Sequence, residues 1–180
     1  MLALRETTSM SDVYSIWLQP DHDSTEYRRL SGLIDDYSHR YDDAPVFDPH
    51  ITLLGGLSGE QDTITGTTQT LTQERDSFEV SFPHTHCSTT RYQCVFLLVE
   101  PTLELLSLHE SGVEAFETAG EMYVPHLSLI YSDMSLEERL ELVEEIESES
   151  LPEAALFDTV AVVETTGDAK DWETIAEYEF

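Results

Sequence analysis

The chain has 180 residues, with 37 Asp and Glu against 8 Lys and Arg, so its formal net charge is −29. This balance excludes a domain that grips nucleic acid and a polybasic membrane anchor, because both need a basic face that eight scattered cations cannot form. No apolar run is long enough to span a bilayer, and residues 1–10 lack the apolar core of a signal peptide. We therefore expect a soluble cytoplasmic monomer that binds neither polymeric DNA nor membranes.

The acidic residues are distributed along the whole chain, and Lys170 is its only lysine. In molar salt the Debye length falls to about 3 Å, so repulsion among these charges is largely screened. The composition therefore indicates an extreme halophile that keeps salt in its cytoplasm. An acidic protein from an ordinary cell is the alternative.

Strands and helices are predicted to alternate along the chain. The strands are predicted at 14–18, 50–54, 78–82, 92–99, 126–131, 160–163 and 174–180. The helices are predicted at 23–41, 59–75, 103–119 and after residue 135. Asp23 or Ser24 can cap the first helix, and Gly55-Gly56 is interpreted as the turn that ends the second strand.

The last helix carries the clearest start signal. Ser135 and Glu138 form the pattern of a capping box, in which each side chain satisfies the other residue's backbone N–H. Apolar residues at helical spacing predict the face that this helix buries. That face comprises Leu136, Leu140, Val143 and Ile146.

A seven-residue pattern occurs twice. Residues 48–54 read Asp-Pro-His-Ile-Thr-Leu-Leu, and residues 124–130 read Val-Pro-His-Leu-Ser-Leu-Ile. Because alternate side chains of a strand share a face, each copy presents an imidazole and a hydroxyl together and packs its aliphatic residues behind them. We interpret the two copies as a duplication that gives two similar lobes.

Two imidazoles and two hydroxyls that converge on one cleft suit displacement at phosphorus. A neutral imidazole takes a proton from water while a protonated one gives a proton to a leaving oxygen. The hydroxyls donate hydrogen bonds to oxygens that gain charge in the transition state. A strained cyclic phosphodiester is the best match, and the motifs offer no carboxylate beside the histidines to bind a metal.

The two His-x-Thr/Ser motifs, His50-Ile51-Thr52 and His126-Leu127-Ser128, resemble those of the two-histidine phosphoesterases. Further stretches are similar to the cyclic phosphodiesterase branch of that superfamily, and the resemblance runs from about Val13 to the C-terminus. These stretches are 14–18, 49–56, 91–99 and 125–131.

The resemblance implies an α+β fold of two lobes. Two antiparallel sheets related by a pseudo-twofold axis would enclose a central cleft, with the helices outside. It also implies one domain over residues 13–180, preceded by an N-terminal extension at 1–12, in which Met10 is an alternative start.

By resemblance, the chain is a metal-independent hydrolase that needs no cofactor. It would convert a nucleoside 2′,3′-cyclic phosphate or ADP-ribose 1″,2″-cyclic phosphate to a phosphomonoester. His50 and His126 would be the acid–base pair, and Thr52 and Ser128 would bind phosphate oxygens. The resemblance also places Tyr131 and, more weakly, Trp17 beside the substrate.

Two alternatives stay open. One is a two-histidine enzyme that processes RNA ends, against which the lack of a basic face counts. The other is a non-catalytic module that binds a nucleotide, although such a module has no need of a proton donor and acceptor. For the enzyme we expect activity to rise with molar salt, because screening admits an anionic substrate to an acidic protein.

The remaining histidines are interpreted as having no catalytic role, and a cytoplasmic location favours free thiols for the cysteines. His22 and His39 should face solvent beside the first helix, and His109 should lie on a helix surface. One histidine pair is a candidate for a Zn²⁺ site, and the cysteine pair is a candidate for a disulfide. His84 and His86 share a strand face but lack a third metal ligand, and Cys87 and Cys94 flank a turn, with their pairing left open.

Overall fold

The computed structural model describes residues 12–119 and 122–180. All of the predicted N-terminal extension except Asp12 lies outside the described residues. The strands are β1 (Val13–Pro20), β2 (Ile51–Ser58), β3 (Phe78–Ser81), β4 (His84–Cys87), β5 (Val95–Leu98), β6 (His126–Ile130), β7 (Ala154–Glu164) and β8 (Glu173–Glu179). The helices are α1 (Thr25–Arg40), α2 (Gln61–Thr72), α3 (Leu103–Ala115), α4 (Leu136–Glu147) and the short 3₁₀ helix η1 (Ala169–Asp171).

The strands form one antiparallel sheet in the order β3-β7-β1-β2-β6-β5-β4, with β8 paired to β7. The two halves of this sheet meet between β2 and β6, where the only pair in register is Ile51 with Leu127. The predicted α+β class is confirmed. The two expected sheets are joined into one hydrogen-bonded path because the two motif strands pair at this single point.

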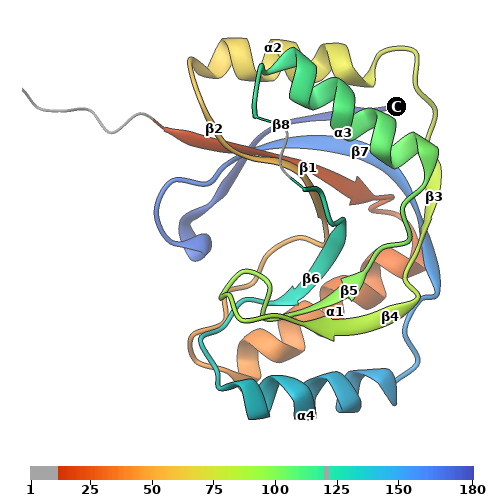
Figure 1. The fold of residues 1–180 in the computed structure, drawn as a ribbon, viewed down its shortest axis with the longest axis vertical. Coiled ribbons are helices and arrows are strands. Elements are labelled where there is room, and N and C mark those ends of the chain that lie inside the picture. The colour runs from red at the N-terminus through yellow and green to blue at the C-terminus, as the bar shows by residue number, and fades with distance from the viewer. Residues whose placement is uncertain (1–11, 120–121) are drawn as a thin grey trace, which may run out of the picture.

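The helices exchange partners between the two halves. α1 precedes β2 in the chain but packs against β6, whereas α3 precedes β6 but packs against β2. Figure 1 shows α2 and α3 together at one end of the molecule and α1 and α4 at the other. This reciprocal packing is the arrangement that a pseudo-twofold relation between duplicated lobes requires.

The predicted turn at Gly55-Gly56 is wrong, because β2 continues through both glycines to Ser58. Tyr14 of β1 pairs with Leu57, but Ile16 pairs with Leu54, so β2 contains an extra residue at this point. Gly56 has a φ of 70°, which glycine adopts without steric cost. The two glycines therefore absorb a β-bulge and do not end the strand.

The capping box at the start of α4 is confirmed, but its predicted apolar face is partly wrong. Leu136 and Leu140 are 57% and 60% exposed, whereas Arg139 is buried. The Arg139 guanidinium donates hydrogen bonds to four backbone carbonyls, so the helix turns this residue inward. The acceptors are the carbonyl oxygens of Ser88, Thr90, Ser132 and Met134.

The two cysteines are free thiols in the structure. β4 and β5 form the predicted hairpin, but Cys87 lies opposite Val95 and not opposite Cys94. Cys94 is buried, and burial raises the pKa of its thiol. Its environment therefore favours the protonated thiol.

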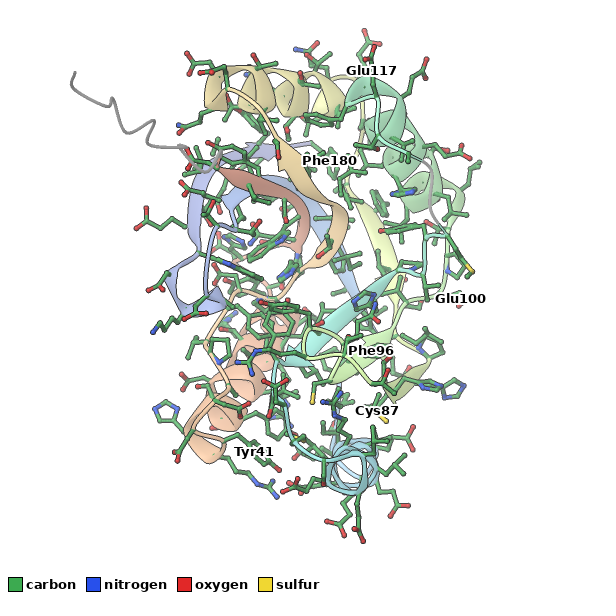
Figure 2. All side chains as sticks on the ribbon, turned by 60° about the vertical axis from the view of Figure 1, so that its left-hand side comes forward. Tyr41, Cys87, Phe96, Glu100, Glu117 and Phe180 are labelled. Carbon is green, nitrogen blue, oxygen red and sulfur yellow. The ribbon has the colours of Figure 1, made fainter. Side chains whose placement is uncertain are left out.

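The acidic side chains project from the surface, and Figure 2 shows oxygen-tipped side chains pointing outward at both ends of the molecule. Few cations oppose them. Arg29 and Arg40 of α1 pair with Glu149 and Glu145, which ties α1 to the region of α4. Such exposed pairs contribute about 0–1 kcal/mol each, so they leave most of the repulsion in place.

Raising KCl from 0.1 to 2 M is expected to raise the midpoint of thermal unfolding, because the Debye length falls from about 10 Å to a few ångströms. Circular dichroism melts at fixed pH measure the shift. Sucrose of equal osmolality is the control for effects that do not depend on charge. An equal shift in sucrose, or a lower midpoint in KCl, would contradict charge screening as the cause.

Candidate active site

The two motifs meet at their middle residues. Ile51 of the first motif pairs with Leu127 of the second in antiparallel register. Continuing this register by one residue in each direction places His50 beside Ser128 and Thr52 beside His126. Each imidazole therefore lies beside the hydroxyl of the other motif, and the site consists of two imidazole–hydroxyl pairs, one on each side of the backbone pair.

The two motif histidines have the same backbone contact. The Nδ1–H of His50 donates to the Asp48 carbonyl at 2.7 Å, and that of His126 donates to the Val124 carbonyl at 2.9 Å. Each acceptor lies two residues before its histidine. These contacts fix the tautomer in which Nε2 carries the free lone pair.

Aromatic rings enclose His50. The Trp17 ring stacks on it with centroids 3.6 Å apart, and Phe47 meets it edge-on at 5.8 Å. The Tyr131 hydroxyl donates to His50 Nε2 at 3.3 Å, and Trp172 contacts both Trp17 and Tyr131 edge-on. As a result, only 3% of His50 is exposed.

This burial changes the ionisation of His50. Removal from water, with a smaller effect of the nearby His126, lowers the pKa of its imidazole to about 3, although the hydrogen bond to the Asp48 carbonyl acts in the opposite direction. His50 is therefore neutral at ordinary pH in this conformation. A neutral imidazole is the form that accepts a proton.

The shift predicts a loss of stability in acid. Below about pH 6.5 the unfolded chain protonates this imidazole while the folded chain does not, so the unfolded state binds more protons. Between about pH 6.5 and pH 3, the wild type should lose about 1.4 kcal/mol of unfolding free energy per pH unit more than His50→Gln. Denaturant unfolding of both proteins in 2 M KCl measures this. Parallel pH dependences would show that His50 is protonated in the folded state.

A hollow of about 590 Å³ lies beside the other imidazole–hydroxyl pair. Both Thr52 and His126 line it, whereas His50 and Ser128 do not. The described residues that line it are Thr52, Leu53, Leu54, Gly55, Gly56, Gln93, His109, Val113, Thr118, Ala119, Met122, Tyr123, Val124 and His126. No carboxylate is among these residues, although the chain has a net charge of −29.

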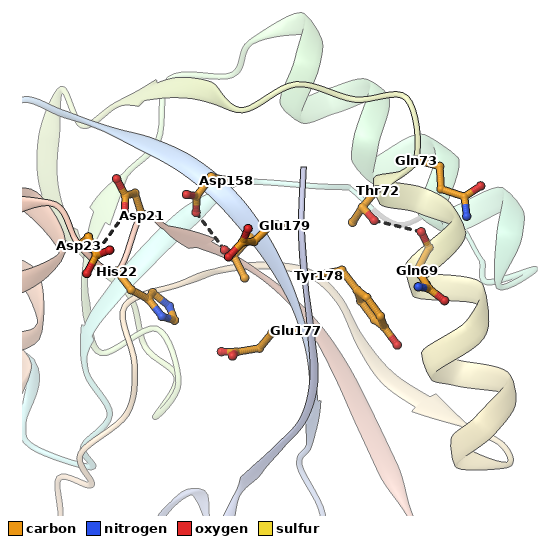
Figure 3. Close-up of a pocket in the computed structure, with 11 residues that line it drawn as sticks. Asp21, His22, Asp23, Gln69, Thr72, Gln73, Asp158, Glu177, Tyr178 and Glu179 are labelled. Carbon is orange, nitrogen blue, oxygen red and sulfur yellow. Dashed lines mark hydrogen bonds between the residues drawn. The ribbon is translucent and has the colours of Figure 1, made fainter.

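Four other hollows among the described residues each include carboxylates. The one drawn in Figure 3 has a volume of about 660 Å³ and lies between α2 and the strands β7 and β8. Its acidic residues are Asp21, Asp23, Asp158, Glu177 and Glu179. It contains no motif residue, and its charge opposes the entry of a phosphate.

His109 lies on α3, as predicted, but it is not fully exposed. His109 is half-buried, and its Nδ1–H donates to the Leu53 carbonyl at 2.9 Å. Its ring stacks on Tyr123 at 3.8 Å, and the Tyr123 hydroxyl donates to the Thr52 carbonyl at 3.2 Å. The stacked pair therefore binds β2 at two consecutive backbone carbonyls, those of Thr52 and Leu53.

The cations near the site are already paired. Arg91 contacts the carboxylates of Asp43 and Asp133 at 3.0 and 2.7 Å. Lys170 lies 3.8 Å from Asp168. At the meeting point of the motifs, the groups that can contact a phosphate are therefore the hydroxyls and the imidazoles.

All the residues predicted for the site lie around the meeting point of the motifs. The Ser128 hydroxyl donates to the Tyr92 carbonyl at 3.1 Å. Burial raises the pKa of the Tyr131 phenol, and the neighbouring Ser128 hydroxyl has a smaller, lowering effect on it. Sequence reasoning missed the surrounding rings and His109. The missed rings are those of Phe47, Tyr92, Tyr123 and Trp172.

His84 and His86 share an exposed face of β4, as predicted. In the described ranges, no group of three or more His, Cys, Asp or Glu side chains is placed to hold a metal ion. None of the described helices is long and apolar enough to cross a membrane. His22 and His39 are exposed, also as predicted.

Comparisons with known sequences point in one direction. The sequence model of the family described as cyclic phosphodiesterase-like protein matches residues 10–180. The cyclic phosphodiesterase of Arabidopsis thaliana is 28% identical over 129 residues, which cover 71% of this chain and 70% of that protein. The 2′,3′-cyclic-nucleotide 3′-phosphodiesterase of Yarrowia lipolytica is 26% identical over 158 residues, covering 67% of this chain and 73% of that protein.

The fold is also similar to solved structures. The crystal structure of E. coli LigT complexed with NADP+ superposes with a TM-score of 0.60, covering 96% of this chain and 99% of that chain. The two sequences are 9% identical, so this likeness concerns the fold.

Proposed function

Because the chain belongs to the cyclic phosphodiesterase-like family of the two-histidine phosphoesterases, and is a hydrolase acting on phosphoric diesters, we propose that His50 and His126 hydrolyse a nucleoside 2′,3′-cyclic phosphate. Thr52 and Ser128 bind the phosphate oxygens, and Tyr131 and Trp17 orient His50. No metal takes part in the proposed reaction. The product is a phosphomonoester.

The observation that carries this proposal is the symmetric placement of two imidazole–hydroxyl pairs about one backbone pair. A phosphate at the centre of that arrangement can contact a hydroxyl and an imidazole on each side. In-line displacement needs an activated water on one side of phosphorus and a protonated leaving oxygen on the other. The two imidazoles supply these two functions from opposite sides.

The proposed reaction is a single displacement at phosphorus. One neutral imidazole removes a proton from water, whose oxygen forms a bond to phosphorus. The bond between phosphorus and one ribose oxygen breaks, and the other imidazole, initially protonated, donates its proton to that oxygen. The hydroxyls of Thr52 and Ser128 donate hydrogen bonds to the oxygens that gain charge.

The names of the relatives and the charge of the described lining support this substrate class. The name of the Yarrowia lipolytica relative specifies a 2′,3′-cyclic nucleotide, and E. coli LigT is solved with NADP+ and with 3′-AMP. The described residues that line the hollow beside Thr52 and His126 include no carboxylate, which favours the entry of an anion. ADP-ribose 1″,2″-cyclic phosphate presents the same five-membered phosphate ring and is the second substrate to test.

Phosphorus NMR of the protein with adenosine 2′,3′-cyclic phosphate, in 2 M KCl with EDTA, tests the proposal. We expect the cyclic phosphate signal to be replaced by a monoester signal, whose shift identifies the oxygen that keeps the phosphate. The double variant His50→Ala/His126→Ala is the control for contaminating activity. If neither cyclic compound is converted by the wild type, the proposed function is wrong.

A further inference from the structure

Gln93 has an unused side-chain amide in the hollow beside the catalytic residues. It lies in the loop between β4 and β5, where its backbone N–H donates to the Thr90 hydroxyl and its carbonyl accepts from the Ser88 N–H. The backbone is therefore fixed. Among the described residues, the side-chain amide of Gln93 makes no hydrogen bond, although it lines the same hollow as Thr52 and His126.

The two sides of the catalytic centre differ in the space that they offer. On the side of His50 and Ser128, aromatic rings close the site, and the hollow beside Trp17 and Trp172 has a volume of about 220 Å³. On the side of Thr52, the hollow measures about 590 Å³. Sites for small organic ligands measure about 300–1,000 Å³, so only the second hollow has the size for the rest of a nucleotide.

The lining of this hollow suits a planar, weakly polar group. Its walls are mainly apolar, with the stacked rings of His109 and Tyr123 on one side. Val124 is half exposed and Met122 is almost fully exposed at its rim. A few polar groups in a mainly apolar pocket are what fix the orientation of a ligand, and the Gln93 amide supplies both a donor and an acceptor.

We propose that this hollow binds the nucleobase of the substrate and that Gln93 hydrogen-bonds to the edge of the base. The proposal rests on the proposed function, because a cyclic phosphate held between the motif residues directs its ribose and base toward the open side. A side-chain amide matches the paired donor and acceptor on a base edge, as glutamine does with adenine. Gln93 is therefore a specificity residue that takes no part in proton transfer.

The test compares a substrate that has a base with one that lacks it. Adenosine 2′,3′-cyclic phosphate and 1-O-methylribose 2′,3′-cyclic phosphate present the same phosphate ring. For the wild type in 2 M KCl, we expect kcat/KM to be at least about tenfold higher for the adenosine compound. In Gln93→Ala, kcat/KM for that compound should fall about 5- to 20-fold, as for one lost hydrogen-bonded pair, and stay unchanged for the base-free compound. Gln69→Ala, an exposed glutamine of α2 outside the hollow, is the matched control.

Each other result overturns the inference. Equal kcat/KM values for the two substrates in the wild type would show that the base makes no contact. An equal loss on both substrates in Gln93→Ala would show that Gln93 supports the catalytic centre and does not recognise the base.

The failure of the proposed function has a different signature, in which neither substrate is hydrolysed. Calorimetric binding of adenosine 2′-monophosphate against ribose 2-phosphate then decides the inference without turnover. Tighter binding of the adenosine compound, reduced in Gln93→Ala but not in Gln69→Ala, supports a base site in the hollow. Equal affinities overturn it.

Discussion

Replacing His126 or His50 by alanine is expected to lower kcat on a cyclic phosphate about 10²–10⁴-fold, the usual effect of losing one acid–base group. KM should change far less, because the hydroxyls of Thr52 and Ser128 still contact the phosphate. Initial rates over a range of substrate concentrations separate the two parameters. His22→Ala, which removes an exposed imidazole away from the motifs, is the matched control.

Equal losses of binding and rate would instead favour a non-catalytic module that binds a nucleotide. His50→Ala leaves a cavity under the Trp17 ring, so its stability must be measured as well. His50→Gln keeps most of the side-chain volume without an acid–base group. A normal rate in a folded His50→Gln protein would exclude His50 from the chemistry.

The same variants assign the two catalytic roles. A p-nitrophenyl phosphodiester has a leaving group that departs without protonation, so loss of the general acid should lower kcat on this substrate only slightly. Loss of the general base should lower kcat on the aryl ester as much as it lowers kcat on the cyclic substrate. We expect one of the two alanine variants to recover most of its rate on the aryl ester, and that residue is the acid.

Removing either motif hydroxyl is expected to lower kcat about 10²–10³-fold, because each donates to an oxygen that gains charge in the transition state. Thr52→Val preserves the shape of the side chain and removes only the donor. Ser128→Ala also leaves the Tyr92 carbonyl without its present donor. Thr63→Val, an exposed threonine of α2, is the control for the same chemical change.

The measurement is kcat with saturating cyclic nucleotide, accompanied by product affinity. A loss of affinity for the phosphomonoester equal to the loss of kcat would mean that the hydroxyl binds ground and transition states alike. Unchanged kcat in both variants would remove the hydroxyls from the mechanism. The symmetric placement of Thr52 and Ser128 predicts losses of similar size.

The core of the site could be predicted from the sequence because it is encoded locally and twice. The spacing of His50 and Thr52 fixes their common face on a strand, and the repeated pattern at His126 and Ser128 predicts a partner for each. The capping box of α4 was predictable for the same reason, since its two residues are three positions apart. In each case one short segment contains the whole signal.

The surroundings of the site depend on contacts between distant segments, which no local pattern encodes. Trp172 packs edge-on against Trp17 and Tyr131, the rings that contact His50, from a loop in the last tenth of the chain. His109 has the spacing of a surface residue but donates to a carbonyl of β2. Arg139 is charged, and only the four carbonyls that meet in space explain why it replaces the predicted leucines inside.

The single backbone pair of Ile51 and Leu127 also has a mechanical consequence. If one half of the molecule rotates against the other about this pair, atoms move in proportion to their distance from it. The four motif side chains adjoin this pivot, so their spacing would barely change. The rims of the hollow, including Val124, lie further from the pair and would move more. Such a rotation would change the shape of the hollow more than the spacing of the reacting groups.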